Sequence, residues 1–169
     1  TINLHASLLP KYRGAAPINW ALINGEKQTG LTTFFINEKI DEGDILLQSN
    51  IDINEQWHAN DLHDALMEKS DQIIYKTIEV VFNGTYKRKK QMKITSKKQQ
   101  YARKIHKTDL KLNNLLWSKM SLYDIYNFIK GMSPPGIKTT IIIPNKNKES
   151  IKKNIIIKRV SNYKNQKLH

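Results

Sequence analysis

The sequence predicts an α/β unit followed by a smaller module of mixed α and β structure. Short β-branched and aromatic runs alternate with helical patterns through residues 1–82, which is typical of an α/β layer. A hydrophilic, lysine-rich stretch interrupts this pattern at residues 87–100. One helical pattern and two isoleucine-rich runs follow between residues 100 and 160. We therefore expect a first domain at 1–86, a basic linker at 87–100 and a second domain at 101–169.

The first domain is expected to begin with three strands and a short helix. Residues 1–5 have the pattern of a strand end, and Pro17 suits the first turn of a helix that Asn24-Gly25 ends. The β-branched and aromatic residues 31–36 predict a strand, and residues 45–53 predict one strand or two short ones. The segment between these last two runs is expected to be a loop.

The longest helix is expected from about Asp61 to Val81. Asn60 is the expected N-cap, and Asn83-Gly84 is expected to end the helix. The residues that recur at helical spacing are Leu62, Ala65, Leu66, Ile73, Ile74, Thr77, Ile78 and Val81.

The second domain is expected to contain a helix at 121–131, which Pro134-Pro135-Gly136 breaks. Two strands, Thr139–Ile143 and Asn154–Val160, are expected after it, with a polar, lysine-bearing loop between them. One face of the helix carries Leu122, Ile125, Tyr126 and Ile129. This order suits an α+β module or a small barrel.

The charge of the chain is distributed very unevenly. Residues 1–86 hold 6 basic and 12 acidic side chains, whereas residues 87–169 hold 22 basic and 3 acidic ones. The overall charge of +13 therefore divides into −6 and +19. A basic half of this kind predicts a polyanionic partner, either nucleic acid or an anionic membrane surface. A codon bias is the alternative source of the lysines, because Ile, Lys and Asn supply 63 of the 169 residues.

Composition excludes several classes of protein. The chain has no cysteine, which excludes a disulfide scaffold, a cysteine nucleophile and a cysteine zinc site. No apolar run approaches the roughly 20 residues that span a bilayer. The five histidines show no ligand spacing, so we expect no metal.

Three polar residues are candidates for a site. Asn3 and His5 are two apart on a presumed strand, so their side chains share a face. Asp41 lies in the loop after a later strand, and loops at one end of an α/β sheet converge. A carboxylate beside an imidazole stabilises the charged ring. The alternatives are a structural Asn-x-His pair and an ordinary acidic turn at residues 41–44.

The run NLHASLLPKYRGAAPI at residues 3–18 closely resembles the signature of folate-dependent formyltransferases, in particular those that act on methionyl-tRNA. The segments GLTT at 30–33 and DEGDI at 41–45 fall at the distances that this family shows. YARKI at 101–105 and SPPG at 133–136 are similar to the family's C-terminal tRNA-binding domain. The resemblance implies the C-terminal half of a Rossmann-like catalytic domain, followed by a partial OB-like β-barrel module.

The resemblance also implies an activity. The family transfers a formyl group from 10-formyltetrahydrofolate to the amino group of methionyl-initiator tRNA, which supports translation initiation. Asn3, His5 and Asp41 match its catalytic residues. Asn3 and a protonated His5 are suited to donate hydrogen bonds to the developing oxyanion. Asp41 is suited to keep His5 charged and to take the proton of the amine.

The same resemblance assigns binding residues. The loop after His5 is expected to bind substrate through Ser7, Leu8, Leu9, Pro10, Lys11 and Arg13. Lysine and arginine side chains of the basic half are expected to neutralise tRNA phosphates in a salt-sensitive manner. They are Lys87, Arg88, Lys89, Lys90, Lys146, Lys148, Lys152 and Lys153.

Two other functions stay open. The first is a formyltransferase that acts on a nucleotide-linked amino sugar, since such enzymes share much of the loop signature. The second is a non-catalytic RNA-binding protein built on the basic half. In the main interpretation we expect a monomer in a bacterial cytoplasm with no membrane contact, an organelle being the other possible location. The start at Thr1 and the end at His169 also lead us to expect a fragment of a longer protein.

Overall fold

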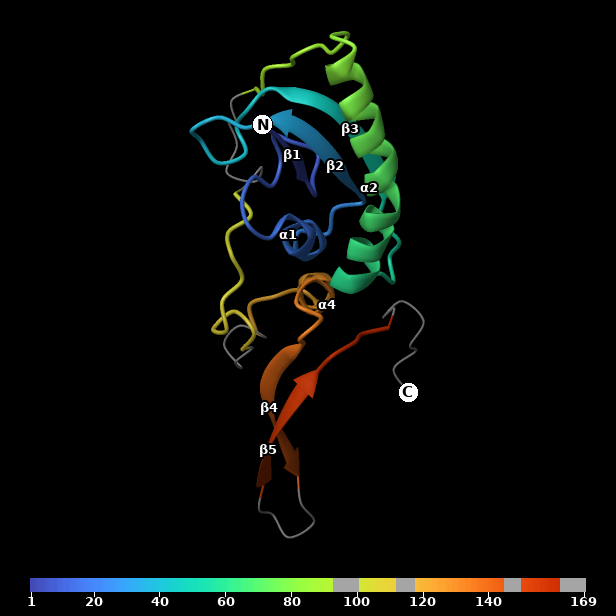
Figure 1. Cartoon of the computed structure of the whole chain (residues 1–169). Coiled ribbons are helices and arrows are strands. Elements are labelled where there is room, and N and C mark those ends of the chain that lie inside the picture. The colour runs from blue at the N-terminus through green and yellow to red at the C-terminus, as the bar shows by residue number, and fades with distance from the viewer. Residues whose placement is uncertain (93–100, 112–117, 145–149, 162–169) are drawn as a thin grey trace.

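A three-stranded sheet forms the centre of the first half of the chain (Figure 1). The computed structural model describes residues 1–92, 101–111, 118–144 and 150–161. Strand β2 (Gln28–Phe35) lies between β1 (Ile2–His5) and β3 (Ile45–Asp52), and both pairings are antiparallel. The alternative of two short strands at 45–53 is thereby resolved in favour of one.

Helix α2 (Ala59–Phe82) packs against β2 and β3, and its buried side includes Leu62 and Ile73. The N-cap is His58 rather than Asn60, so that prediction was wrong by two residues. The backbone of His58 is extended, and its N–H donates to Oδ2 of Asp61 at 2.8 Å. The helix therefore begins early enough to place Asp61 in its first turn, where a carboxylate stabilises the positive end of the dipole.

Helix α1 (Pro17–Ile23) joins the two halves of the chain, because α4 (Leu122–Gly131) packs directly against it (Figure 1). Asn19 Nδ2 donates to the carbonyl of Gly131 at 2.7 Å. A Cβ atom on Gly131 would lie 2.5 Å from the Ile23 side chain and 2.7 Å from the Asn19 carbonyl. Only glycine permits this approach of the two helices.

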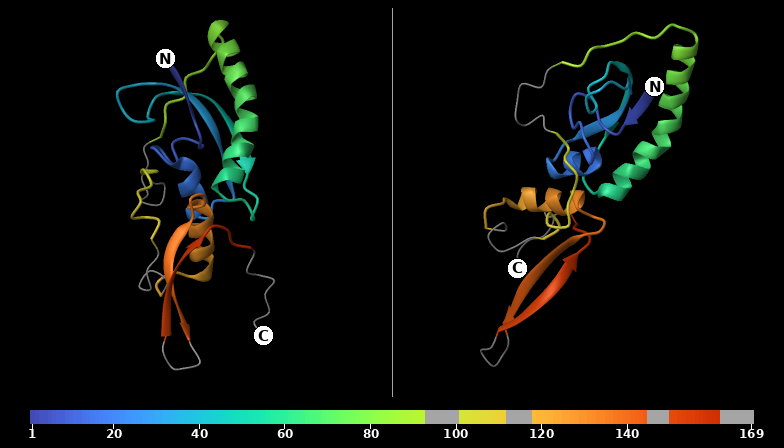
Figure 2. Two further views of the ribbon diagram at one scale, coloured as in Figure 1. Left: turned by 60° about the horizontal axis from the view of Figure 1, so that its bottom comes forward. Right: turned by 60° about the vertical axis from the view of Figure 1, so that its left-hand side comes forward.

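The two isoleucine-rich runs form an antiparallel hairpin, β4 (Ile137–Pro144) and β5 (Ser150–Ile157). Both strands begin before the predicted residues. Within the described part of the chain, this hairpin is an open two-stranded sheet that extends away from the helices (Figure 2). Ile129 and Met132 pack with Ile137 at its base and form a small separate core.

Two residues, Lys89 in the linker and Ala102 just after it, contact the first half of the chain. The backbones of Lys89 and Ile45 exchange two hydrogen bonds at 2.9 and 3.0 Å. The backbone of Ala102 bonds to Arg13 and to Ala16, and its side chain is fully buried in the main core. Lys89 of the linker therefore lies beside the start of β3, and Ala102, just after the linker, lies against the loop that follows β1.

Candidate active site

His5 is the last residue of β1, and its imidazole is 7% exposed. Its Nε2 lies 2.8 Å from the backbone carbonyl oxygen of Tyr12. A carbonyl oxygen only accepts, so Nε2 carries the proton and donates this bond. Nδ1 is therefore the ring atom that is left for chemistry.

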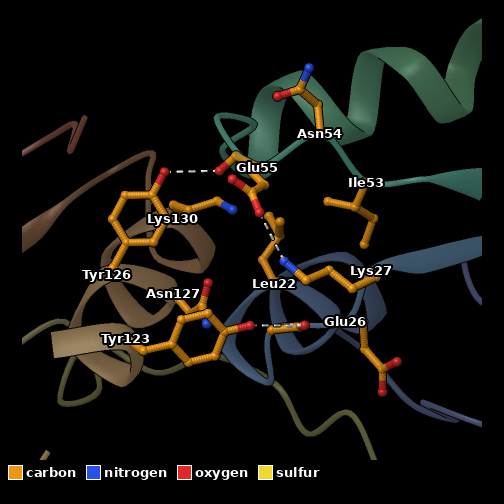
Figure 3. Close-up of a pocket in the computed structure, with 11 residues that line it drawn as sticks. Leu22, Glu26, Lys27, Ile53, Asn54, Glu55, Tyr123, Tyr126, Asn127 and Lys130 are labelled. Atoms are coloured by element: carbon orange, nitrogen blue, oxygen red, sulfur yellow. Dashed lines mark hydrogen bonds and ion pairs between the residues drawn. The ribbon is translucent and has the colours of Figure 1, made fainter. Parts of the chain in front are cut away.

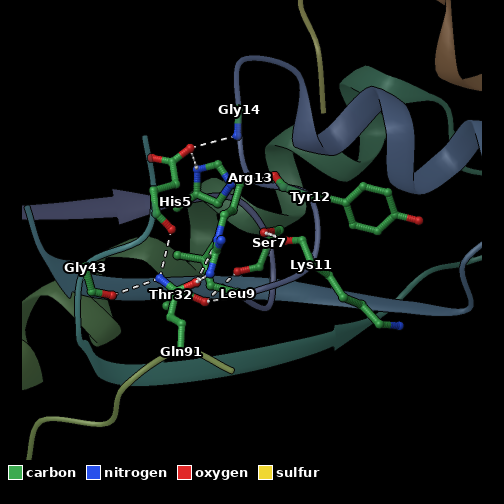
Figure 4. Close-up of polar contacts among 11 residues, drawn as sticks. His5, Ser7, Leu9, Lys11, Tyr12, Arg13, Gly14, Thr32, Gly43 and Gln91 are labelled. Carbon is green, nitrogen blue, oxygen red and sulfur yellow. Dashed lines mark hydrogen bonds and ion pairs between the residues drawn. The ribbon is translucent and has the colours of Figure 1, made fainter. Parts of the chain in front are cut away.

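Asp41 faces this remaining nitrogen. Its Oδ2 lies 3.7 Å from Nδ1 of His5 and accepts a hydrogen bond from the N–H of Gly14 at 2.8 Å (Figure 4). The carboxylate is 14% exposed, and the backbone of Asp41 has a φ of 53°, in the left-handed region. Aspartate tolerates that region better than most residues. The arrangement can hold a protonated imidazole beside a carboxylate.

The structure brings His5 and Asp41 together by a route that the sequence did not predict. We expected two loops at the same end of a sheet. However, β1 and β2 are antiparallel, and Phe35 at the end of β2 lies opposite Ile2 at the start of β1. The loop after β2 therefore begins beside Ile2, at the opposite end of β1 from His5. Both loops instead fold back toward His5 and meet there (Figure 4).

Asn3 lies on the same strand as His5, and its side chain is exposed. Its amide makes no hydrogen bond to another described residue. It is therefore a donor that a bound molecule can use.

Ser7 and Leu9 hold the loop after β1 in place. Ser7 is fully buried, and its Oγ donates to the carbonyl of Lys11 at 2.6 Å. The hydroxyl of Thr32 donates to the Ser7 carbonyl at 2.6 Å and accepts from the N–H of Leu9 at 3.1 Å. Leu8 and Pro10 of the same loop are half-buried. In this structure these groups fix the loop.

The two basic residues of this loop are both paired. The Lys11 ammonium is 45% exposed and lies 3.5 Å from Glu26. The Arg13 guanidinium is only 12% exposed, and its Nη1 lies 3.0 Å from Glu42. Its Nε and Nη2 donate to Oε1 of Gln91 at 2.9 and 2.7 Å. Arg13 is thus held inside the loop cluster, whereas Lys11 is the more open of the two.

Sequence reasoning missed two residues of this cluster, Tyr12 and Gln91. Tyr12 has a positive φ of 60°, and its phenol donates to Glu26 at 2.8 Å and accepts from Asn24. Burial raises the pKa of this phenol, so the neutral form is stabilised. Tyr12 stands inside the signature run, which was a usable signal. Gln91 lies in the lysine-rich stretch, where nothing marked it.

The expected RNA-binding residues of the linker are exposed. Lys87, Lys89 and Lys90 make no ion pair to a described residue, and the guanidinium of Arg88 lies 4.4 Å from the centre of the Phe35 ring. Lys152 and Lys153 are exposed on β5. Lys146 and Lys148 lie outside the described residues.

A pocket at the junction of α1 and α4 lies outside this cluster (Figure 3). Its wall includes Lys130, Asn127, Tyr126 and Lys27. Lys130 is 5% exposed, and burial lowers the pKa of its ammonium. The pocket shares Glu26 with the hydrogen-bond partners of Tyr12.

The described residues show neither a metal site nor a membrane span. No group of three or more histidine or acidic side chains among them is placed to hold a metal ion. None of their helices is both long and apolar enough to cross a membrane.

Comparison with known proteins gives this cluster a context. Residues 1–78 match the family model described as formyl transferase. This chain is a relative of the formyltransferases. The match includes β1, the loop after it and Asp41, which are the parts that carry the cluster.

Several curated methionyl-tRNA formyltransferases are similar to this chain in sequence. The protein of Azobacteroides pseudotrichonymphae is 45% identical over 144 residues, which cover 83% of this chain and 43% of that protein. The protein of Pelotomaculum thermopropionicum is 47% identical over 139 residues, which cover 82% of this chain and 42% of that protein. The chain therefore spans less than half the length of these formyltransferases.

Solved formyltransferase structures share the fold. The sugar 3N-formyl transferase WlaRD superposes with a TM-score of 0.69 at 25% identity, over 85% of this chain and 54% of that chain. An N-formyltransferase from Helicobacter canadensis gives a TM-score of 0.70 at 24% identity, over 85% and 55%. The chain has the α/β fold of this family, and the described hairpin is open where a barrel was expected.

Proposed function

We propose that this chain is part of an enzyme that transfers a formyl group from 10-formyltetrahydrofolate to methionyl-initiator tRNA and so supports translation initiation. The observation that carries the proposal is the pairing of His5 with Asp41 at 3.7 Å inside the segment that matches the formyl transferase family. The identity of 45–47% to methionyl-tRNA formyltransferases supports the choice of acceptor.

The reaction is an acyl transfer between two nitrogens. The methionyl amine attacks the formyl carbon, a C–N bond forms, and negative charge develops on the formyl oxygen. The bond from that carbon to N10 of the folate then breaks, and N10 takes up a proton equivalent to the one that the amine loses. The enzyme must therefore stabilise an oxyanion and move one proton.

The side chains present fit these two tasks. The free amide of Asn3 donates to the oxyanion, and so does a protonated Nδ1 of His5. Oδ2 of Asp41 is held by Gly14, while its Oδ1 has no hydrogen bond to a described residue. Oδ1 takes the proton of the amine, directly or through a water. No covalent intermediate is required, in agreement with the absence of cysteine.

The residues that follow His5 bind the substrates in this proposal. Lys11 is the exposed cation of the loop and is the group that reaches a phosphate of the tRNA end. Arg13, which is buried and paired, supports the loop from inside. The half-buried Leu8 and Pro10 line the folate and acceptor site, and the buried Ser7 and Leu9 support the loop beneath them.

The basic half supplies the tRNA contacts. We propose that residues 1–86 are the catalytic domain, 87–100 the linker and 101–169 the tRNA-binding domain, with β4 and β5 as strands of an OB-like barrel. The exposed Lys87, Lys89 and Lys90 precede the second domain and neutralise phosphates. We propose further that the protein acts as a monomer in the bacterial cytoplasm, in keeping with its bacterial relatives.

The test is a formyl-transfer assay with the full-length protein, labelled 10-formyltetrahydrofolate and charged initiator tRNA. The expected product is formylmethionyl-tRNA. Replacing Lys87, Lys89 and Lys90 by alanine is expected to weaken tRNA binding and to flatten its dependence on salt concentration. If the labelled formyl group stays on the folate with every initiator tRNA offered, the proposal is wrong.

A sugar-nucleotide acceptor is the second candidate, and the structural likeness to WlaRD favours it. That enzyme was crystallised with dTDP and 5-N-formyl-THF. The same assay with dTDP-linked amino sugars in place of tRNA separates the two acceptors. Formyl transfer to a sugar, with none to tRNA, would select the second candidate.

A further inference from the structure

Gln91 lies outside both expected domains, and its side chain joins the two loops of the site. Its Nε2 donates to the backbone carbonyls of Asp41 and Gly43, each at 2.8 Å (Figure 4). Its Oε1 accepts from two nitrogens of Arg13. The two protons and the two lone pairs of the amide are all used, so its orientation is fixed.

The loop after β2 depends on these bonds. Among the hydrogen bonds of the described residues, the backbone carbonyls of residues 38–43 accept only from Gln91. Asp41 is held in the left-handed region of backbone space, a conformation that surrounding contacts must maintain. Gln91 therefore fixes the backbone of Asp41, whose carboxylate faces His5.

The loop after β1 is fixed by the same amide. The guanidinium of Arg13 forms an ion pair with Glu42 at 3.0 Å and donates hydrogen bonds to Gln91. Gly14, the next residue, donates its N–H to Asp41. The amide thus closes a ring of contacts that runs from Asp41 through Gln91, Arg13 and Gly14 back to the carboxylate.

We propose that Gln91 is a positioning residue: it holds Asp41 against His5 and couples the first residues of the basic linker to the site. The inference rests on the proposed function, because it assigns Gln91 a role in that reaction. It touches neither substrate nor reacting atoms. Its effect reaches the chemistry through the placement of Asp41.

Two substitutions separate the hydrogen bonds that Gln91 donates to the loop of Asp41 from those that it accepts from Arg13. Gln91→Ala removes all four hydrogen bonds. Gln91→Glu retains an oxygen for Arg13 but replaces the donor by an oxygen, which repels the carbonyls of Asp41 and Gly43. If the role ran through Arg13 alone, Gln91→Glu would behave as wild type. Met92→Ala is the matched control, since Met92 is the next residue and is 76% exposed.

The first measurement is hydrogen exchange of the Gly14 amide in the full-length protein. Its N–H donates to Asp41, so it reports the position of the carboxylate whether or not the protein is an enzyme. Both Gln91 variants are expected to raise its exchange rate about tenfold relative to Met92→Ala, because a hydrogen bond to a charged group is lost. Equal exchange in all three proteins overturns the proposal.

The second measurement is steady-state formyl transfer. Both Gln91 variants are expected to lower kcat by about tenfold to a hundredfold with little change in KM, because the reacting groups are displaced. A Gln91→Glu protein with wild-type kcat contradicts the proposal even if Gln91→Ala is slow. A wild-type protein that transfers no formyl group refutes the proposed function, and the Gly14 exchange then still decides the role of Gln91.

Discussion

Nε2 of His5 donates a hydrogen bond of 2.8 Å to the backbone carbonyl of Tyr12. This bond fixes the neutral tautomer of the ring and turns Nδ1 toward Asp41. The first prediction concerns the tautomer. In alkaline solution, nitrogen NMR of the full-length protein is expected to show a protonated Nε2 and an unprotonated Nδ1 for His5. The reverse pattern would contradict the orientation of the ring.

The second prediction concerns Tyr12 and alkaline pH. Burial raises the pKa of its phenol in the folded protein above the ordinary value of 10.0. Tyr12 therefore stabilises the fold fully below about pH 10, and this contribution is lost as the pH rises further, because the unfolded chain releases the proton first. In Tyr12→Phe, the free energy of unfolding is expected to fall less steeply above pH 10 than in wild type. Chemical denaturation at several pH values measures it, and identical slopes would be evidence against a buried phenol.

The third prediction concerns the close approach of Gly43 to β2. A Cβ atom on Gly43 would clash with the backbone carbonyl oxygen of Phe35, so alanine must push the loop of Asp41 outward. Gly43→Ala is expected to lower the free energy of unfolding by about 1–3 kcal/mol and to reduce formyl transfer as well.

The control for this substitution is Gly84→Ala. Gly84 has a φ of +67° but nothing within 4 Å, so alanine there introduces backbone strain alone. It is expected to destabilise the fold by about 1 kcal/mol and to leave turnover unchanged. A Gly43→Ala protein with normal turnover would show that the loop tolerates displacement.

The fourth prediction concerns the core under α2. Leu62 is fully buried between the helix and the sheet, whereas Ile78 is 59% exposed on the same helix. Leu62→Ala is expected to lower the free energy of unfolding by about 2–5 kcal/mol, because a cavity remains. Ile78→Ala is expected to change it by less than about 0.5 kcal/mol. Urea titrations of both variants test the contrast, and equal losses would mean that the two residues are similarly packed.

Much of the fold follows from local pattern. Pro17 and Asn24-Gly25 marked the ends of α1, and the strand predicted at 31–36 overlaps β2, which begins at Gln28 and ends at Phe35. The antiparallel pairing of β1 with β2 has no local signal, because strand direction is decided by long-range packing. The N-cap was misplaced since Asn60 is the better local cap, whereas His58 is buried against the second half of the chain and accepts from Val160.

The candidate site was predictable only in part. The signature run pointed to His5 and the segment at 41–45 pointed to Asp41, and the structure brings their side chains together. The same run marked Arg13 as a substrate contact. In the structure its guanidinium forms an ion pair with Glu42 and donates hydrogen bonds to Gln91. Gln91 itself was not predictable, because the sequence of a polar segment does not distinguish a solvated glutamine from one that is hydrogen-bonded to another loop.

The central claim is that His5 and Asp41 act together in formyl transfer. Its most direct test is the kcat of Asp41→Asn for methionyl-initiator tRNA, with Asp44→Asn as the control that makes the same charge change in the same loop. Asp41→Asn is expected to lower kcat by about a hundredfold or more, since it removes both the base and the partner of the charged ring. Asp44→Asn is expected to match wild type. An Asp41→Asn protein that turns over as fast as Asp44→Asn would contradict the claim.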